Sequence, residues 1–319
     1  MTSINVRPLR DDLPFGARIS GVTYQTLEDE AIRRQINDVF EDRGMIVFEG
    51  VEPSPQMHLA ISNIFGPLKD HPVPAVKRVD DDWMPGVIDM AHDPEDGGIV
   101  EIQGEQLSCW LPWHFDHCYN NELNRAGVLR AVTIPPEGGL TGFADGIQLY
   151  NAISPELLRK IEDAKVIYTL NVDYQRLDFG APPGFREISA KPLVGEMNDY
   201  AKELPRAIHP AVWQRPSGEK VLHVSPWMAE GLEGDETPDG TSLLKAVCQE
   251  IQDKVQPYFH RWSPTDMLIW DNWRMLHSVT GHDPQYPRRM QRTTIKGDYG
   301  LGYFENQAAG HAILAETEV

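Results

Sequence analysis

"DMLIWDN", residues 266–272, is a short apolar run that ends in Asp271 and Asn272, and it indicates a buried β-strand. Similar runs occur at "GVLRAVTI" (127–134) and "KVLHVS" (220–225), with turns between them. The 25 prolines and 26 glycines of the chain are scattered and do not gather in a linker. This pattern of short strands predicts a mostly β fold with helical cover, a double-sheet jelly roll.

Three helical patterns would supply the cover. Residues 29–44 have apolar positions at helical spacing and stop at Gly44. Residues 154–164, "SPELLRKIEDA", begin with a serine at the N-cap position and Pro155 at the first helical position. A third helix is expected to begin near Thr241.

Composition narrows the classes of protein. The 319 residues are 41% hydrophobic and 24% charged, which is typical of a soluble globular protein. The net charge of −19 would repel a nucleic-acid backbone, so no nucleic-acid partner is expected. No apolar run approaches the roughly 18 residues of a membrane span, and the opening residues lack a signal-peptide core, which predicts a cytoplasmic protein with no membrane partner.

The cysteines argue against a metal site built from thiolates. Cys109, Cys118 and Cys248 are an odd number, and no two of them form a CxxC pair. A disulfide framework or a thiolate zinc site is therefore not expected, and the default is three reduced thiols.

A different motif carries the candidate chemistry. "WHFDHCYN", residues 113–120, holds two histidines and an aspartate within four positions. In a strand, residues two apart share a face, so His114 and Asp116 would project together and His117 would lie on the other face. On the order of one His-x-Asp sequence is expected by chance in a chain of this composition. The pair is therefore weak evidence for a metal site until a third ligand is found.

His277 is the best third ligand, because it follows the strand of residues 267–270 and could reach the first pair from a strand end. Two histidines and one carboxylate on one face of a metal leave the opposite positions open, as in non-haem Fe(II) oxygenases. Zinc would accept the same ligand types.

Two arginines follow this histidine. In "YPRRMQRTTIKGD", residues 286–298, Arg288 and Arg292 are four apart and would share one face of a strand, with Arg289 on the other. Paired guanidinium groups beside a metal pocket can bind two separate carboxylates, one from a cosubstrate and one from a substrate.

In this order the motifs resemble the TauD/TfdA family of Fe(II)- and 2-oxoglutarate-dependent dioxygenases. The likeness extends over most of the chain and is carried by the His114-Phe115-Asp116 motif, "GGLTGFADG" (138–146), "DMLIWDN", His277, Arg288 and Arg292, with further similarity at residues 15–22, 44–50, 65–73 and 208–224. Phe115, His117, Cys118 and Trp273 depart from the residues common in the family.

The resemblance implies a set of roles. His114, Asp116 and His277 would hold Fe(II), Arg288 would pair with the far carboxylate of 2-oxoglutarate, and Thr141 would hydrogen-bond this cosubstrate, with O2 as the oxidant. It also implies a single double-stranded β-helix domain over residues 1–319, with an insertion over the site at about 142–225, in a dimer or tetramer.

The resemblance also implies residues that would bind the substrate. Arg292 would hold a substrate anion and His71 would lie near it, while Trp110 and Trp113 are candidate walls because they are close to the ligand pair. The charges of Fe(II), Asp116, 2-oxoglutarate and Arg288 cancel, so Arg292 would be an unpaired buried cation unless a substrate anion or a nearby carboxylate pairs with it. We therefore expect a small carboxylate, sulfonate or sulfate.

Two other functions use the same residues. A catalytically silent jelly roll could bind a small acid or a divalent metal, and a zinc-dependent hydrolase or lyase could use the same ligands. The expected function is hydroxylation of a C–H bond with release of succinate and CO2.

Overall fold

The strand predicted at residues 266–272 lies in the middle of the main sheet. In the computed structural model, which describes residues 3–71, 73, 76–80 and 84–306, it is β17 (Met267–Asp271), and all five of its residues are buried. Leu268 and Trp270 belong to one core cluster, and Met267 and Ile269 to another. The run is continuously apolar because both of its faces are covered.

β17 is part of the larger of two main sheets. The strands of this sheet are β1 (Asn5–Pro8), β2 (Ala17–Ser20), β3 (Met45–Glu49), β4 (Arg78–Asp80), β5 (Met84–His92), β8 (Ala126–Thr133), β17 and β19 (Arg288–Ile295). Their order within the described residues is β1-β2-β3-β17-β8-β19-β5-β4.

The second main sheet contributes most of the site. Its strands are β6 (Ile99–Ile102), β7 (Glu105–His114), β9 (Thr141–Asp145), β11 (Arg186–Ser189), β16 (Tyr258–His260) and β18 (Met275–His282), in the order β11-β6-β7-β18-β9-β16. One core cluster takes Phe143 and Met275 from this sheet and Leu129, Trp270 and Met290 from the larger one. The shared core shows that the two sheets face each other, as a jelly roll requires.

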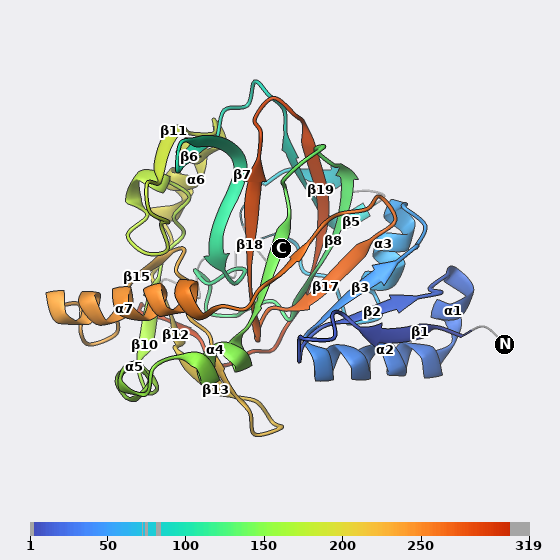
Figure 1. Ribbon diagram of the computed structural model, residues 1–319, viewed down its shortest axis with the longest axis horizontal. Coiled ribbons are helices and arrows are strands. Elements are labelled where there is room, and N and C mark those ends of the chain that lie inside the picture. Colours follow the sequence, from blue (N-terminus) through green and yellow to red (C-terminus); the bar gives the residue numbers. More distant parts are fainter. Residues whose placement is uncertain (1–2, 72, 74–75, 81–83, 307–319) are drawn as a thin grey trace.

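Helices cover the outer side of the larger sheet (Figure 1). They are α1 (Tyr24–Glu28), α2 (Glu30–Arg43) and α3 (Pro55–Ser62). In α2, Ile32, Ile36 and Phe40 are buried at four-residue spacing, Asp29 caps the first turn, and Gly44 ends the helix at φ 74°. The prediction for residues 29–44 is therefore confirmed.

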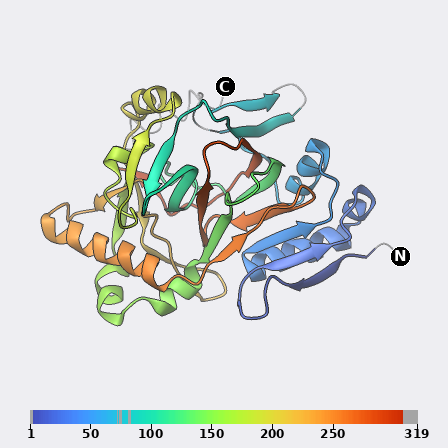
Figure 2. The ribbon, with the colours of Figure 1, turned by 45° about the horizontal axis from the view of Figure 1, so that its top comes forward.

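Smaller elements pack beside the second sheet (Figure 2). They are α4 (Gly146–Ala152), α5 (Pro155–Ile161), η1 (Tyr174–Arg176), α6 (Leu193–Ala201) and α7 (Pro238–Lys254), with the strands β10 (Lys165–Tyr168), β12 (Ala207–Pro210), β13 (Val212–Gln214), β14 (Lys220–Leu222), β15 (Ala229–Leu232) and β20 (Tyr303–Phe304). β10, β12, β15 and β20 form a small sheet, and β13 pairs with β14.

The other two predicted helices need small corrections. α5 starts at Pro155 as predicted, but the Ser154 side chain makes no capping hydrogen bond. α7 starts at Pro238, three residues before Thr241, because Thr237 caps it through the amide of Gly240. Across the described ranges, no helix is both long and apolar enough to cross a membrane.

Candidate active site

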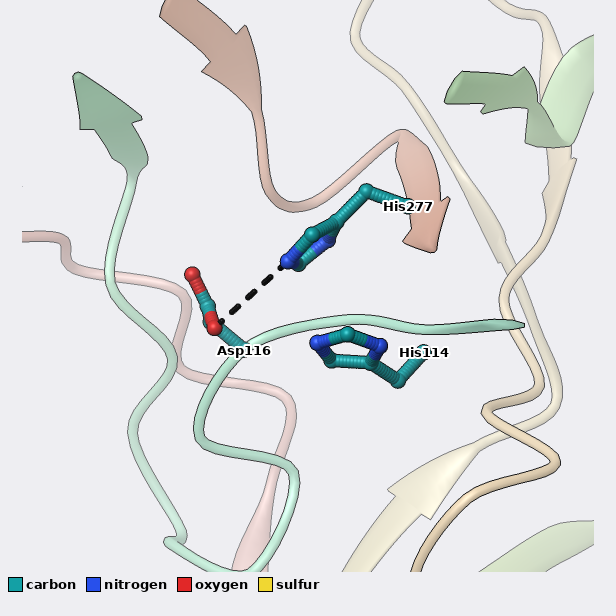
Figure 3. A group of neighbouring side chains, drawn as sticks. All are labelled: His114, Asp116 and His277. Atoms are coloured by element: carbon teal, nitrogen blue, oxygen red, sulfur yellow. Dashed lines mark ion pairs between the residues drawn. The ribbon is translucent and has the colours of Figure 1, made fainter. Parts of the chain in front are cut away.

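Three side chains from distant segments converge between the sheets (Figure 3). His114 is the last residue of β7, Asp116 lies in the turn that follows, and His277 is in β18, directly opposite His114 in the strand register. All three are buried, and one ligand atom from each lies within 4.8 Å of the others. His277 Nε2 is 3.7 Å from Asp116 Oδ1.

The protonation states suit metal binding. Burial lowers the pKa of both His114 and His277. His114 Nδ1 donates to the Pro112 carbonyl at 2.8 Å, which leaves the Nε2 lone pair for a ligand. The buried Asp116 Oδ2 has no hydrogen-bond partner in the part of the chain that the structure describes. Two neutral imidazoles and a carboxylate fit Fe(II).

The local geometry of Asp116 differs from the prediction. β7 ends at His114, so Asp116 is in a turn and not in a strand. His117 adopts φ 59° and lines the same cavity as Asp116, so its expected place on the opposite face is wrong. A turn places consecutive side chains differently from the two-residue alternation of a strand.

Asn272, the last residue of the opening motif, holds this turn. Its side-chain oxygen accepts from the Asp116 amide at 2.8 Å, and its Nδ2 donates to the Asp116 carbonyl at 3.0 Å. The same Nδ2 group also donates to Asn124 Oδ1 at 3.1 Å, and the Asn272 carbonyl lies 2.9 Å from His223 Nε2. Asn272 thus fixes the backbone of a ligand residue 156 positions away, a role that the sequence analysis did not assign to it.

Arg292 is already paired. Its Nη1 donates to Asp116 Oδ1 at 2.7 Å, and both side chains are 9% exposed. Burial by itself would raise the pKa of Asp116, but nearby positive charge, above all that of Arg292, outweighs burial and holds that pKa below its usual range. Of the two partners expected for Arg292, a substrate anion or a nearby carboxylate, the structure shows the second, because Asp116 supplies the counter-charge.

Arg288 is the contrasting case on the same strand, β19. It is buried, its Nη2 donates to the Gly139 carbonyl at 3.3 Å, and no ion pair to it is found within residues 3–71, 73, 76–80 and 84–306. Burial lowers its pKa, since a charged guanidinium loses hydration. Arg289 faces away as predicted, and its Nε donates to Asp89 at 2.7 Å.

A cavity of about 160 Å³ opens beside the three converging side chains. Its polar wall is formed by His71, His114, Asp116, His117 and Arg292. The remainder is largely apolar and consists of Val76, Leu111, Phe115, Tyr119, Leu170, Val172, Met197, Trp227 and Met228. The segment expected as an insertion, 142–225, contributes three of these residues, but its boundaries stay a prediction.

Three other predicted residues, Thr141, Trp110 and Trp113, are not among the residues that line this cavity. Thr141 accepts a hydrogen bond from Trp262 Nε1 at 3.0 Å, so its own hydroxyl hydrogen can still be donated. Trp110 packs against Tyr174 and Phe185, and Trp113 against Phe259, so neither lines the cavity. The tryptophan that lines the cavity is Trp227, whose ring stands edge-on to that of His114 with 4.9 Å between the ring centroids. No motif in the sequence marks Trp227, so it is identified only from its position in the fold.

Comparisons with known proteins agree with this geometry. A family described as "Taurine catabolism dioxygenase TauD, TfdA family" matches residues 5–294. The chain belongs to the TauD/TfdA family. The predictions of an oxidoreductase and of Fe(II), 2-oxoglutarate and O2 as its cofactor, cosubstrate and oxidant are confirmed at the level of that family.

Two relatives of this TauD/TfdA member match along nearly their whole lengths. The (S)-phenoxypropionate/alpha-ketoglutarate-dioxygenase of Sphingobium herbicidovorans is 26% identical, over 93% of this chain and 96% of the relative. The alpha-ketoglutarate-dependent 2,4-dichlorophenoxyacetate dioxygenase of Cupriavidus pinatubonensis is 25% identical, over 89% and 95%. Alpha-ketoglutarate is another name for 2-oxoglutarate.

A solved structure confirms the fold. The putative alpha-ketoglutarate-dependent taurine dioxygenase from Burkholderia xenovorans superposes with a TM-score of 0.68 at 22% identity, over 98% of this chain and 99% of that one. The jelly roll expected from the pattern of strands and turns is therefore confirmed.

Proposed function

We propose that this TauD/TfdA member hydroxylates a C–H bond of a small organic anion and releases succinate and CO2. The observation that carries the proposal is the buried convergence of His114, Asp116 and His277 beside a largely apolar cavity. These three residues would hold Fe(II), which with 2-oxoglutarate and O2 supplies the oxidising chemistry when bound. The chain's own residues bind, orient and exclude water around that centre.

Arg288 would bind the far carboxylate of 2-oxoglutarate. Its charge is buried without an acidic partner among the described residues, so a ligand carboxylate would relieve the cost of burying it. Thr141, with a hydroxyl hydrogen left after it accepts from Trp262, would donate to the same cosubstrate.

Charge supports an anionic substrate. The charges of Fe(II), Asp116, 2-oxoglutarate and Arg288 cancel, and Arg292 then leaves the site with one positive charge. Fe(II) would bind the Asp116 carboxylate that now pairs with Arg292, and this would weaken the ion pair. The Arg292 guanidinium would then be available to a substrate anion. A carboxylate, sulfonate or sulfate would restore neutrality.

The body of the substrate would be apolar. The apolar lining of the cavity includes Leu170, Val172, Met197 and Trp227. The two relatives are named for aryloxy acids, which combine an apolar ring with an acidic group. His71 lines the same cavity and would lie beside the acid. Contacts of Trp110 and Trp113 with substrate, a cytoplasmic location and a dimer or tetramer stay predictions.

An anaerobic titration tests this function. Adding Fe(II) and then 2-oxoglutarate should produce the weak visible charge-transfer band of the chelate, and Zn(II) in place of Fe(II) should not. Under air, succinate should form with at least one member of a panel of aryloxy acids, alkyl sulfates and sulfonates, and not with the corresponding neutral alcohols. No band and no succinate would point to a silent binding protein or a zinc enzyme instead.

A further inference from the structure

His117 has a backbone conformation that is uncommon outside glycine, although histidine adopts it more often than most residues. It follows Asp116 directly and adopts φ 59°, in the left-handed region that few residues other than glycine occupy. Such strain concentrates at binding and catalytic sites, where the surrounding structure imposes it. Here the strain accompanies a ring that lines the cavity beside the candidate metal ligands.

The His117 ring is buried without hydrogen bonds. The residue is 4% exposed, and neither Nδ1 nor Nε2 has a partner in the described part of the chain. Burying polar atoms without partners opposes folding, and an apolar ring could fill the same volume without that cost. Packing alone therefore does not explain a histidine at this position.

The neighbours of His117 define what could bind there. The His71 ring stands edge-on to it, with 5.1 Å between ring centroids. His71 Nδ1 accepts from the Val73 amide at 3.1 Å, so the hydrogen of the neutral His71 ring is on Nε2. Arg292 lines the same cavity. Three side chains that donate hydrogen bonds thus share one wall, and the rest of the cavity is mostly apolar.

We propose that His117 is a substrate-binding residue whose ring N–H donates to an acidic oxygen of the substrate, at the wall that it shares with His71 and Arg292. This inference rests on the proposed function and adds the residue that orients the acid. It needs no change in the protonation of His117, because the neutral ring and the charged ring both carry at least one N–H. The ligand it fits is a small acid with an apolar body.

The test uses the full-length protein loaded anaerobically with Fe(II) and 2-oxoglutarate. Three probes, (S)-2-phenoxypropionate, hexyl sulfate and hexanesulfonate, are titrated while the chelate band is followed, and the tightest binder is taken to the variants. His117→Phe keeps a ring and removes the donors. His117→Asn keeps a donor and tolerates a positive φ. His117→Leu repeats the test if the Phe variant does not fold.

We expect His117→Phe to weaken binding of the acid by roughly 10- to 100-fold, the loss typical for a hydrogen bond to a charged group. His117→Asn should restore part of the affinity. The affinity for 2-oxoglutarate, the intensity of the band and the thermal midpoint should stay near those of the wild type, which a purely structural role would not allow.

The outcomes separate the two proposals. If the band forms and a probe binds the wild type, but His117→Phe or His117→Leu binds that probe as tightly, the role of His117 is overturned and the proposed function stands. If the band forms but no probe perturbs it in the wild type, the role of His117 and the acidic substrate are both overturned, and only the binding of Fe(II) and 2-oxoglutarate is upheld. If the band itself does not form, the proposed function fails and this inference fails with it.

Discussion

Arg292 and Asp116 form a buried ion pair, with 2.7 Å between Nη1 and Oδ1. The same carboxylate is one of the three candidate metal ligands. The Asp116 carboxylate thus balances the charge of Arg292 and would also bind the proposed iron. Loss of either partner should therefore affect stability and metal binding together.

Asp116→Ala should destabilise the metal-free protein. Removing one partner of a buried pair leaves the other charge uncompensated, which typically costs about 3–5 kcal/mol. The free energy of unfolding, measured with urea in the presence of a chelator, should fall by that order, and Fe(II) binding should be lost. The double variant Asp116→Ala/Arg292→Met should recover much of the stability but no iron binding. A single variant as stable as the wild type would show that the pair contributes little.

Arg288→Met should have the opposite effect on stability. Arg288 is buried without an acidic partner in the described residues, so an apolar side chain of similar length removes a desolvation cost. The metal-free protein should be as stable as the wild type or more stable, while the apparent affinity for 2-oxoglutarate falls sharply.

The neighbouring arginine is the matched control for that experiment. Arg289→Met would leave the Asp89 carboxylate, 1% exposed, without its partner. This variant should lose stability and keep its affinity for 2-oxoglutarate. If Arg288→Met also kept the affinity of the wild type, Arg288 would not be the cosubstrate anchor.

Gly139 offers a finer test of the same anchor. Its φ is +62°, and a Cβ there would lie 3.2 Å from Arg288 Nε and 3.0 Å from a carbon of Pro135. Gly139→Ala should displace the guanidinium and raise the KM for 2-oxoglutarate. Gly50→Ala is the control, because Gly50 has φ +66° with nothing within 4 Å of the added carbon. Both variants should lose roughly 1–2 kcal/mol to backbone strain, and equal KM values would contradict the contact with Arg288.

Much of the site could be predicted from sequence because strand periodicity is local. The four-residue spacing of Arg288 and Arg292 sets one face of β19, and the apolar run at residues 267–270 indicated the buried strand before His277. The family resemblance supplied the meeting of His277 with the His114 pair. These predictions depend on short stretches or on motifs whose order is informative.

The remaining features depend on contacts between distant residues. Nothing in "WHFDHCYN" shows that the strand stops at His114, that His117 takes φ 59°, or that Asn272 holds the Asp116 backbone. The Arg292–Asp116 pair joins residues 176 positions apart. A periodicity argument assigns faces within one element, so it cannot identify partners that only the packing of two sheets brings together.

Acid should destabilise the protein well above the pH at which carboxylates protonate. Burial lowers the pKa of His58 to about 4 and that of His209 to about 4, although backbone hydrogen bonds to Val128 and Asn120 oppose the shift. The unfolded chain binds these protons near pH 6.5 and the folded chain does not, so the free energy of unfolding falls as pH drops from 6.5 towards 4. Each such histidine adds a slope of about 1.4 kcal/mol per pH unit.

Urea unfolding of the metal-free protein at pH 7.5, 6.0 and 5.0 measures the slope. His58→Gln, which can still donate to the Val128 carbonyl but does not titrate, should reduce it by the share of one histidine. A slope that His58→Gln leaves unchanged would mean that the folded protein does not lower the pKa of His58.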